Sequence, residues 1–85
     1  MIRFRASFAR QAANLDEAVK RAALATARDL DGADPPSERD PTVLVPPALR
    51  LRARRIRATA LGLAYVVVGE DVEVVAVVPL GAVKV

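Results

Sequence analysis

The sequence predicts an α+β fold, with helices packed on one face of a four-stranded sheet. Two observations support this prediction. Apolar residues alternate with polar ones at the N-terminus and in the C-terminal half, and between these segments they recur every three or four positions. The expected order is one strand, one or two helices, and then a three-stranded antiparallel meander. A chain of 85 residues holds one hydrophobic core, so we expect residues 1–85 to form a single domain.

The first strand and the helical region meet near Phe8. Ile2 and Phe4 alternate with Arg3 and Arg5, which is typical of a strand with one face in the core. From Phe8 to Leu30 the apolar residues follow helical spacing instead. We therefore expect Phe8 to be a buried anchor between the first strand and the helices.

The helical region can be one bent helix or two helices. Asn14 is followed three residues later by Glu17, the spacing of a capping box, which favours a second helix from about Asp16 to Leu30. Gly32 stands where a helix C-cap is expected. The alternative of a single bent helix stays open at this point.

A proline-rich loop is predicted at residues 31–48. Five of the six prolines lie in this stretch, and proline interrupts both helices and central strands. Residues 43–45, Val-Leu-Val, are the exception and can form a short extended segment. A loop of this length is usually mobile or functional.

An arginine-rich strand follows the loop. Leu49, Leu51 and Ala53 alternate with arginines, but Ile56 and Ala58 fall out of phase with them. A β-bulge at residues 54–55 would restore the phase and gather the arginines on the opposite face as a basic ribbon. Arg55 and Arg57 are then expected to point away from the helices.

The last two strands form an apolar hairpin. Residues 61–68 and 72–78 are nearly continuous apolar runs, separated by the short turn Gly69-Glu70-Asp71. Strands that are apolar on both faces need cover on both faces, one from the helices and the other from a partner or from the chain's own loop. We expect a helix supplied by a partner protein first and a homodimer through the hairpin second, so that the isolated chain is not a stable monomer.

Composition excludes several classes of chemistry. The chain has no Cys and no His, so it has no disulfide, no imidazole base and none of the usual zinc ligands, and we expect neither a metal nor another cofactor. The longest apolar run, residues 61–69, is too short for a membrane helix. We therefore expect a cytoplasmic protein without a membrane partner.

Two features are candidates for a binding site. Arginines crowd the segment before the hairpin, where they can bind phosphates or an acidic partner. They are Arg50, Arg52, Arg54, Arg55 and Arg57. Tyr65, the one tyrosine, can stack on a base or position a substrate, or it can be a core residue whose hydroxyl reaches the surface.

The whole pattern resembles the RelE/ParE family of bacterial toxins from toxin–antitoxin modules. The resemblance covers nearly the entire chain and rests on the strand before Ser7-Phe8-Ala9, the helix ending in Asp29-Leu30, and Arg55-Ile56-Arg57 leading into the strand with Tyr65. In this family the corresponding strands carry basic residues and a tyrosine. The family's arginine two or three residues before that tyrosine is Gly62 or Leu63 here, and its C-terminal tyrosine has no equivalent in residues 79–85.

The resemblance implies the toxin component of a type II module, inhibiting growth and neutralised by a cognate antitoxin. Its target would be ribosome-bound mRNA or DNA gyrase, and a catalytically active member would be a ribosome-dependent mRNA endonuclease that uses arginine and lysine in place of histidine. The alternative is a non-enzymatic protein-interaction domain of the same fold that has lost toxin activity.

Overall fold

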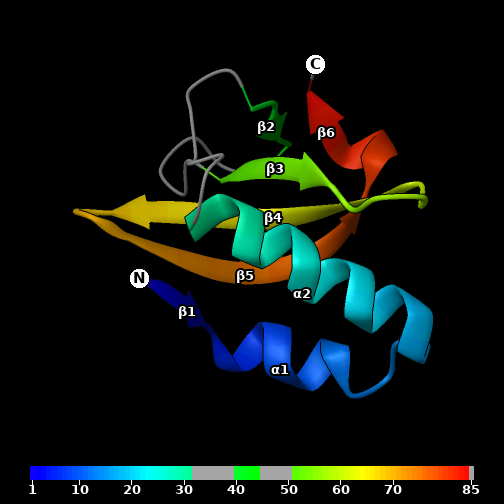
Figure 1. The fold of residues 1–85 in the computed structure, drawn as a ribbon. Helices are drawn as coiled ribbons and strands as arrows, with labels where there is room; N and C mark the ends of the chain where they lie inside the picture. Colours follow the sequence, from blue (N-terminus) through cyan, green and yellow to red (C-terminus); the bar gives the residue numbers. More distant parts are fainter. Residues whose placement is uncertain (32–39, 45–50, 85) are drawn as a thin grey trace.

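The computed structural model describes residues 1–31, 40–44 and 51–84, and it places the helices on one face of a mixed sheet (Figure 1). The helices are α1 (Ala6–Ala12) and α2 (Glu17–Asp31). The strands are β1 (Ile2–Phe4), β2 (Thr42–Val43), β3 (Arg52–Arg55), β4 (Leu61–Val68), β5 (Asp71–Pro79) and β6 (Val83–Lys84). The predicted α+β class is confirmed.

Within the described residues the strand order is β1-β5-β4-β3-β2-β6. The neighbours β3, β4 and β5 are antiparallel, as the meander prediction requires, and β1 pairs parallel to β5. Two strands of two residues each, β2 and β6, extend the expected four-stranded sheet. β2 lies within the segment predicted as the proline-rich loop and includes Val43, whereas Leu44 is an exposed bend and Val45 falls outside the described residues.

The helical region is two helices, and the second occupies nearly the predicted range. The proposed capping box is wrong, because the side chain of Asn14 donates backwards to the carbonyl of Arg10 (3.4 Å) and so closes α1. Asp16 directly precedes α2 instead, and its carbonyl accepts from the backbone N–H of Lys20 (2.8 Å). The predicted cap Gly32 lies outside the described residues.

The main core lies between the two helices and the sheet. Its α2 side is built mainly from small residues, Ala23 and Ala27, which let the helix approach the strands closely. Phe8 is 3% exposed and stacks on Phe4 with ring centroids 5.3 Å apart, so the predicted anchor is confirmed. The sheet side of this core consists of Ile56, which directly follows β3, and of Leu63, Tyr65, Val72, Val74 and Val77.

Helix α1 also covers the edge of β5 beyond the end of β1. The side-chain amide nitrogen of Gln11 donates to the backbone carbonyl of Val77, and the backbone N–H of Val77 donates to the side-chain oxygen Oε1 of Gln11, both at 2.7 Å. Ser7 donates in the same way to the carbonyl of Val75 (2.7 Å). These side chains replace a neighbouring strand, so this stretch of edge is not left unpaired.

The second face of the sheet is covered in part by the chain itself. After β5, a 3₁₀ turn (Leu80–Ala82) carries the chain to β6, which pairs with β2 on the far side of β3. The sheet therefore curls away from the helices around a second cluster, made of Val43, Leu51, Ala53, Ala64 and Val83. The second face of the apolar hairpin was predicted to be covered by a partner or by the chain itself. The chain's own segments cover part of this face, and association with a partner stays a prediction.

The large apolar residues that stay exposed do not belong to either of these two clusters. Val67 and Val68, near the tip of the β4–β5 hairpin, are 56% and 53% exposed. The hairpin turn lies where it was predicted but is one residue shorter, because Asp71 already belongs to β5, and its Gly69 has φ 62°. Neither α1 nor α2 combines the length and apolar composition that a membrane-crossing helix requires.

Candidate anion-binding site

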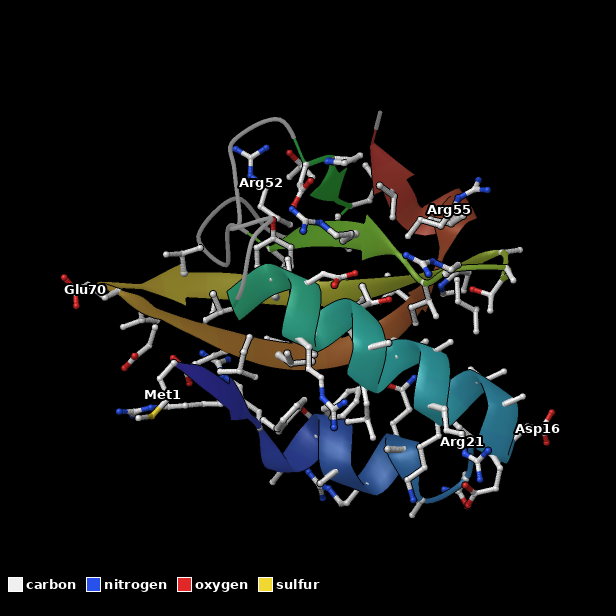
Figure 2. The ribbon with its side chains drawn as sticks, viewed as in Figure 1. Met1, Asp16, Arg21, Arg52, Arg55 and Glu70 are labelled. Atoms are coloured by element: carbon white, nitrogen blue, oxygen red, sulfur yellow. The ribbon has the colours of Figure 1, made fainter. Side chains whose placement is uncertain are left out.

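The arginines of β3 are divided between the two faces of the sheet. Arg52 lies opposite Tyr65, Arg54 opposite Leu63 and Arg55 opposite Gly62, in an uninterrupted register. Residues opposite one another across a strand pair share a face, so Arg52 and Arg54 lie on the side of the helices together with Tyr65 and Leu63. Arg55 lies on the other side, and Figure 2 shows Arg52 and Arg55 at opposite ends of β3.

The predicted bulge at residues 54–55 is therefore wrong, and so is the single basic ribbon. The irregularity lies instead in β5, where Val74 pairs with Tyr65 and Ala76 with Ala64, so that Val75 is passed over. Ile56 is buried on the helix side rather than beside Ala53. Arg50, the first member of the predicted cluster, lies outside the described residues.

On the helix side of the sheet, Asp40 accepts hydrogen bonds from three side chains. Its carboxylate oxygen Oδ2 accepts hydrogen bonds from Arg54 Nη2 (2.9 Å) and from the hydroxyl of Tyr65. Its backbone carbonyl accepts from Arg52 Nη1 (3.0 Å), which also donates to the hydroxyl of Thr42 (3.2 Å). The side chains of Arg54 and Asp40 are 15% and 16% exposed, so this ion pair is largely withdrawn from solvent.

Tyr65 belongs to the core. Its exposed fraction is 0%, and its hydroxyl is bound to Asp40 rather than presented to solvent. Burial raises the pKa of Tyr65 well above its ordinary value, the hydrogen bond to Asp40 and the charge of Asp40 raise it further, and the charges of Arg54 and Arg52 act in the opposite direction. In this conformation the ring has no exposed face on which a base could stack, and its polar contact serves to position Asp40.

Arg55 and Arg57 are the exposed members of the predicted cluster. Neither has an ion-pair partner among the described residues. With Arg54 they border a hollow of about 340 Å³ beside α2, here named the arginine hollow. Its other lining residues are Ala22, Ala25, Thr26, Asp29 and Ala58. Arg57 thus lies near α2, and the prediction that it points away from the helices does not fit its place beside this hollow.

The turn after β3 holds Arg57 at the rim of this hollow. The Thr59 hydroxyl donates to the carbonyl of Ile56 (2.8 Å) and accepts from the N–H of Leu61 (3.1 Å), which closes the turn from within. Ala58 has φ 62°, a backbone conformation that costs energy for any residue with a Cβ. Strained residues of this kind often accompany functional sites, and this one directly follows Arg57.

A second hollow lies beside β3, where Ala53 and Val83 of the second cluster border it. It measures about 260 Å³ and is here named the apolar hollow, because Ala53, Pro41, Leu80 and Val83 form most of its wall. Arg54, Arg55 and Asp40 complete it. Arg54 and Arg55 border both hollows.

Sequence reasoning did not identify Thr42 as a member of the site, and it did not place Asp40 beside Tyr65. Asp40 lies 25 residues before Tyr65, in the loop predicted from its prolines, and only the fold brings the two together. Among the described residues, no carboxylates gather into a group that could hold a metal ion. The arrangement can attract anions through Arg55 and Arg57, whereas its tyrosine and the carboxylate of Asp40 are already engaged with each other.

Comparison of the chain with protein-family models, with curated proteins and with solved structures found no match.

Proposed function

We propose that this chain is the toxin component of a type II toxin–antitoxin module, a RelE/ParE-like growth inhibitor that acts in the cytoplasm and is neutralised by a cognate antitoxin. The observation that carries the proposal is the pair of exposed arginines, Arg55 and Arg57, at the end of β3 beside α2. These residues belong to the segment on which the resemblance to the toxin family rests. The order of a strand, two helices and an antiparallel meander supports it as well.

The arginines would bind the target rather than perform proton transfer. Exposed guanidinium groups attract phosphates, and each phosphate they neutralise makes binding more dependent on salt. Ribosome-bound mRNA and the DNA complex of gyrase both present such phosphates. A toxin of this kind would act on ribosome-bound mRNA or on DNA gyrase, with Arg55 and Arg57 as the contact residues.

A second candidate is a non-enzymatic interaction domain of the same fold. The burial of Tyr65 favours it, because the tyrosine that could serve an RNA-cleaving site is bound to Asp40 inside the fold. In this alternative the same arginines would bind an acidic partner, and expression of the chain would not arrest growth.

Induced expression in a bacterial host separates the two candidates. The proposal predicts growth arrest when the chain is expressed alone and normal growth when the protein encoded by the neighbouring gene is expressed with it. Arrested cells are then assayed for mRNA decay and for DNA supercoiling, which identifies the target. Normal growth at a verified level of soluble chain would contradict the toxin proposal and favour the interaction domain.

A further inference from the structure

The sheet has a free edge at β1. This strand is the first in the order β1-β5-β4-β3-β2-β6, so β5 is its one neighbour and no described residue pairs with its other side. Figure 1 shows β1 at the margin of the sheet, with α1 continuing beyond its end. Because the side chains of Ser7 and Gln11 in α1 bond to the edge of β5, the free edge on this side is confined to Ile2–Phe4.

The backbone groups of Ile2 and Phe4 face away from β5. The carbonyl of Met1 and the N–H of Arg5 both bond to β5, each at 3.0 Å. Successive residues of a strand direct their N–H and C=O groups to opposite neighbours, so those of Ile2 and Phe4 point outward. Among the described residues, no hydrogen bond engages these outward groups. The edge therefore offers a donor and an acceptor at two alternate residues.

The charges along this edge are already neutralised within the chain. Arg3 Nη2 lies 3.2 Å from the carboxylate of Asp71, and Arg5 Nε lies 3.3 Å from the carboxylate of Glu73. Charged side chains protect an edge strand from pairing with another chain, and here their charge is balanced by β5. The same balance weakens the attraction for an acidic or phosphate-bearing partner. This edge therefore suits a partner whose own edge is also neutral.

The side chains of the two outward residues are apolar and stay partly exposed. Phe4 is 46% exposed although it stacks on Phe8, and Ile2 is partly buried against the main core. Both lie on the helix side of the sheet, because they are opposite Val72 and Val74 of that core. A strand placed beside β1 would cover these two side chains further.

A second copy of β1 fits this edge when it runs antiparallel about a two-fold axis at Arg3. Ile2 of each copy then lies opposite Phe4 of the other, in hydrogen-bonded pairs that use every outward donor and acceptor. These pairs bring apolar side chains together on the helix side. On the other face the two Arg3 side chains meet, each beside the Asp71 of its own copy, so the group as a whole is neutral. The edge is thus self-complementary, as a two-fold interface requires.

From these observations we infer that the free edge of β1 is an interface for a second copy of this chain, which joins two sheets into one through antiparallel β1 strands. The strand contact is only three residues long in each copy, so the dimer is expected to be weak. β5 and β4 separate β1 from β3, so the inference does not depend on the proposed function. It also places the dimer contact on a different strand edge from the hairpin that the sequence favoured for a homodimer.

Sedimentation equilibrium of the full chain, from micromolar to millimolar concentration, tests the association. The average mass should rise from that of the monomer toward that of the dimer. Ile2→Pro removes an outward N–H and keeps the bonds to β5, so it should weaken the dimer by about tenfold or more. Val67→Lys with Val68→Lys, at the exposed hairpin tip, is the control and should leave the dimer unchanged. A chain that stays monomeric throughout, or a dimer lost in the hairpin variant alone, would overturn the inference.

A single cysteine tests the register without removing a backbone group. The chain has no Cys, so Arg3→Cys places one thiol of each copy at the proposed axis. A non-hydrogen-bonded pair of this kind has Cα atoms about 4.5 Å apart, within the range of a disulfide. With oxidised glutathione as the oxidant, Arg3→Cys should form a cross-linked dimer much faster than Val68→Cys at the hairpin tip. Equal rates, or a faster reaction of the hairpin variant, would contradict the β1 interface.

Hydrogen exchange locates the contact in the unsubstituted chain. The amide of Phe4 points outward, whereas that of Arg5 bonds to β5. We expect Phe4 to be protected at high concentration and not at low concentration, and Arg5 to be protected at both. Exchange at Phe4 that does not change with concentration, in a chain that dimerises, would place the interface elsewhere and refute the inference.

Discussion

The hydroxyl of Tyr65 donates a hydrogen bond to the carboxylate of Asp40, a residue 25 positions earlier that also accepts from Arg54. This contact joins the core of the sheet to the segment that enters β2. It also withdraws from solvent the one tyrosine of the chain. The ionisation of Tyr65 is therefore coupled to folding.

Stability should fall at alkaline pH because of this residue. The folded state raises the pKa of Tyr65 above the unfolded value of about 10, so the folded state holds the phenolic proton more tightly. The contribution to the free energy of unfolding is complete below about pH 10 and declines as pH rises toward the folded pKa. Denaturant unfolding at several pH values measures this decline.

Tyr65→Phe is the control for that experiment. It removes the titrating group, so the variant should lose less stability between neutral and strongly alkaline pH than the wild type does. Since there is one tyrosine, tyrosinate absorbance reports Tyr65 alone and should appear together with unfolding. Tyrosinate absorbance near pH 10 in a chain that is still folded would contradict the buried, Asp40-bound hydroxyl.

Replacing Phe8 with Ala should destabilise the fold strongly. The ring is 3% exposed between α1 and the sheet, and its removal leaves a cavity that costs about 3–5 kcal/mol. Phe4→Ala is the matched comparison, because Phe4 stacks on Phe8 but is 46% exposed. Its cost should be about 1–2 kcal/mol, from half the burial and the lost ring contact. Equal losses from the two substitutions would contradict the packing described.

Ala58→Gly should stabilise the protein. Ala58 has φ 62°, where a Cβ costs about 1–2 kcal/mol, and the greater freedom of an unfolded glycine offsets about half of the gain. We expect a net increase of about 0.5–1 kcal/mol in the free energy of unfolding. Ala60→Gly, in the same turn, has no such strain to relieve and should lose about 0.5 kcal/mol. A loss of stability at both positions would show that the turn is not strained at Ala58.

Much of the fold could be predicted from the spacing of apolar residues. Phe8, the α2 range and the hairpin around Gly69 follow from helical and strand periodicity. The alternation of faces along β3 could not be predicted in the same way. Ile56 and Ala58 fall out of phase with the preceding apolar residues, which suggested a bulge in this strand. The passed-over residue is Val75, in a run of Val and Ala that is apolar on both faces and therefore gives no sign of a change in register.

The candidate site was predictable in part. The arginine cluster was visible in the sequence, and Arg55 and Arg57 are exposed, although Arg57 lies beside α2 and not away from the helices. The contacts that hold Arg52, Arg54 and Tyr65 away from solvent could not be predicted. Asp40 comes close to these side chains only through the long-range pairing of β2 with β3. A spacing argument detects neighbours along one element, and this contact joins residues from separate elements.

The central claim is that the chain arrests growth through Arg55 and Arg57, and the most direct test measures growth after induced expression of three versions at equal soluble level. These are the wild type, the double variant Arg55→Glu with Arg57→Glu, and the double variant Arg10→Glu with Arg21→Glu, which reverses two exposed arginines on the helices. Exposed substitutions usually change stability by less than about 0.5 kcal/mol, so folding should be retained in both variants. We predict that the wild type and the helix variant arrest growth and that the Arg55/Arg57 variant does not. Arrest by all three versions, or by none, would contradict the account.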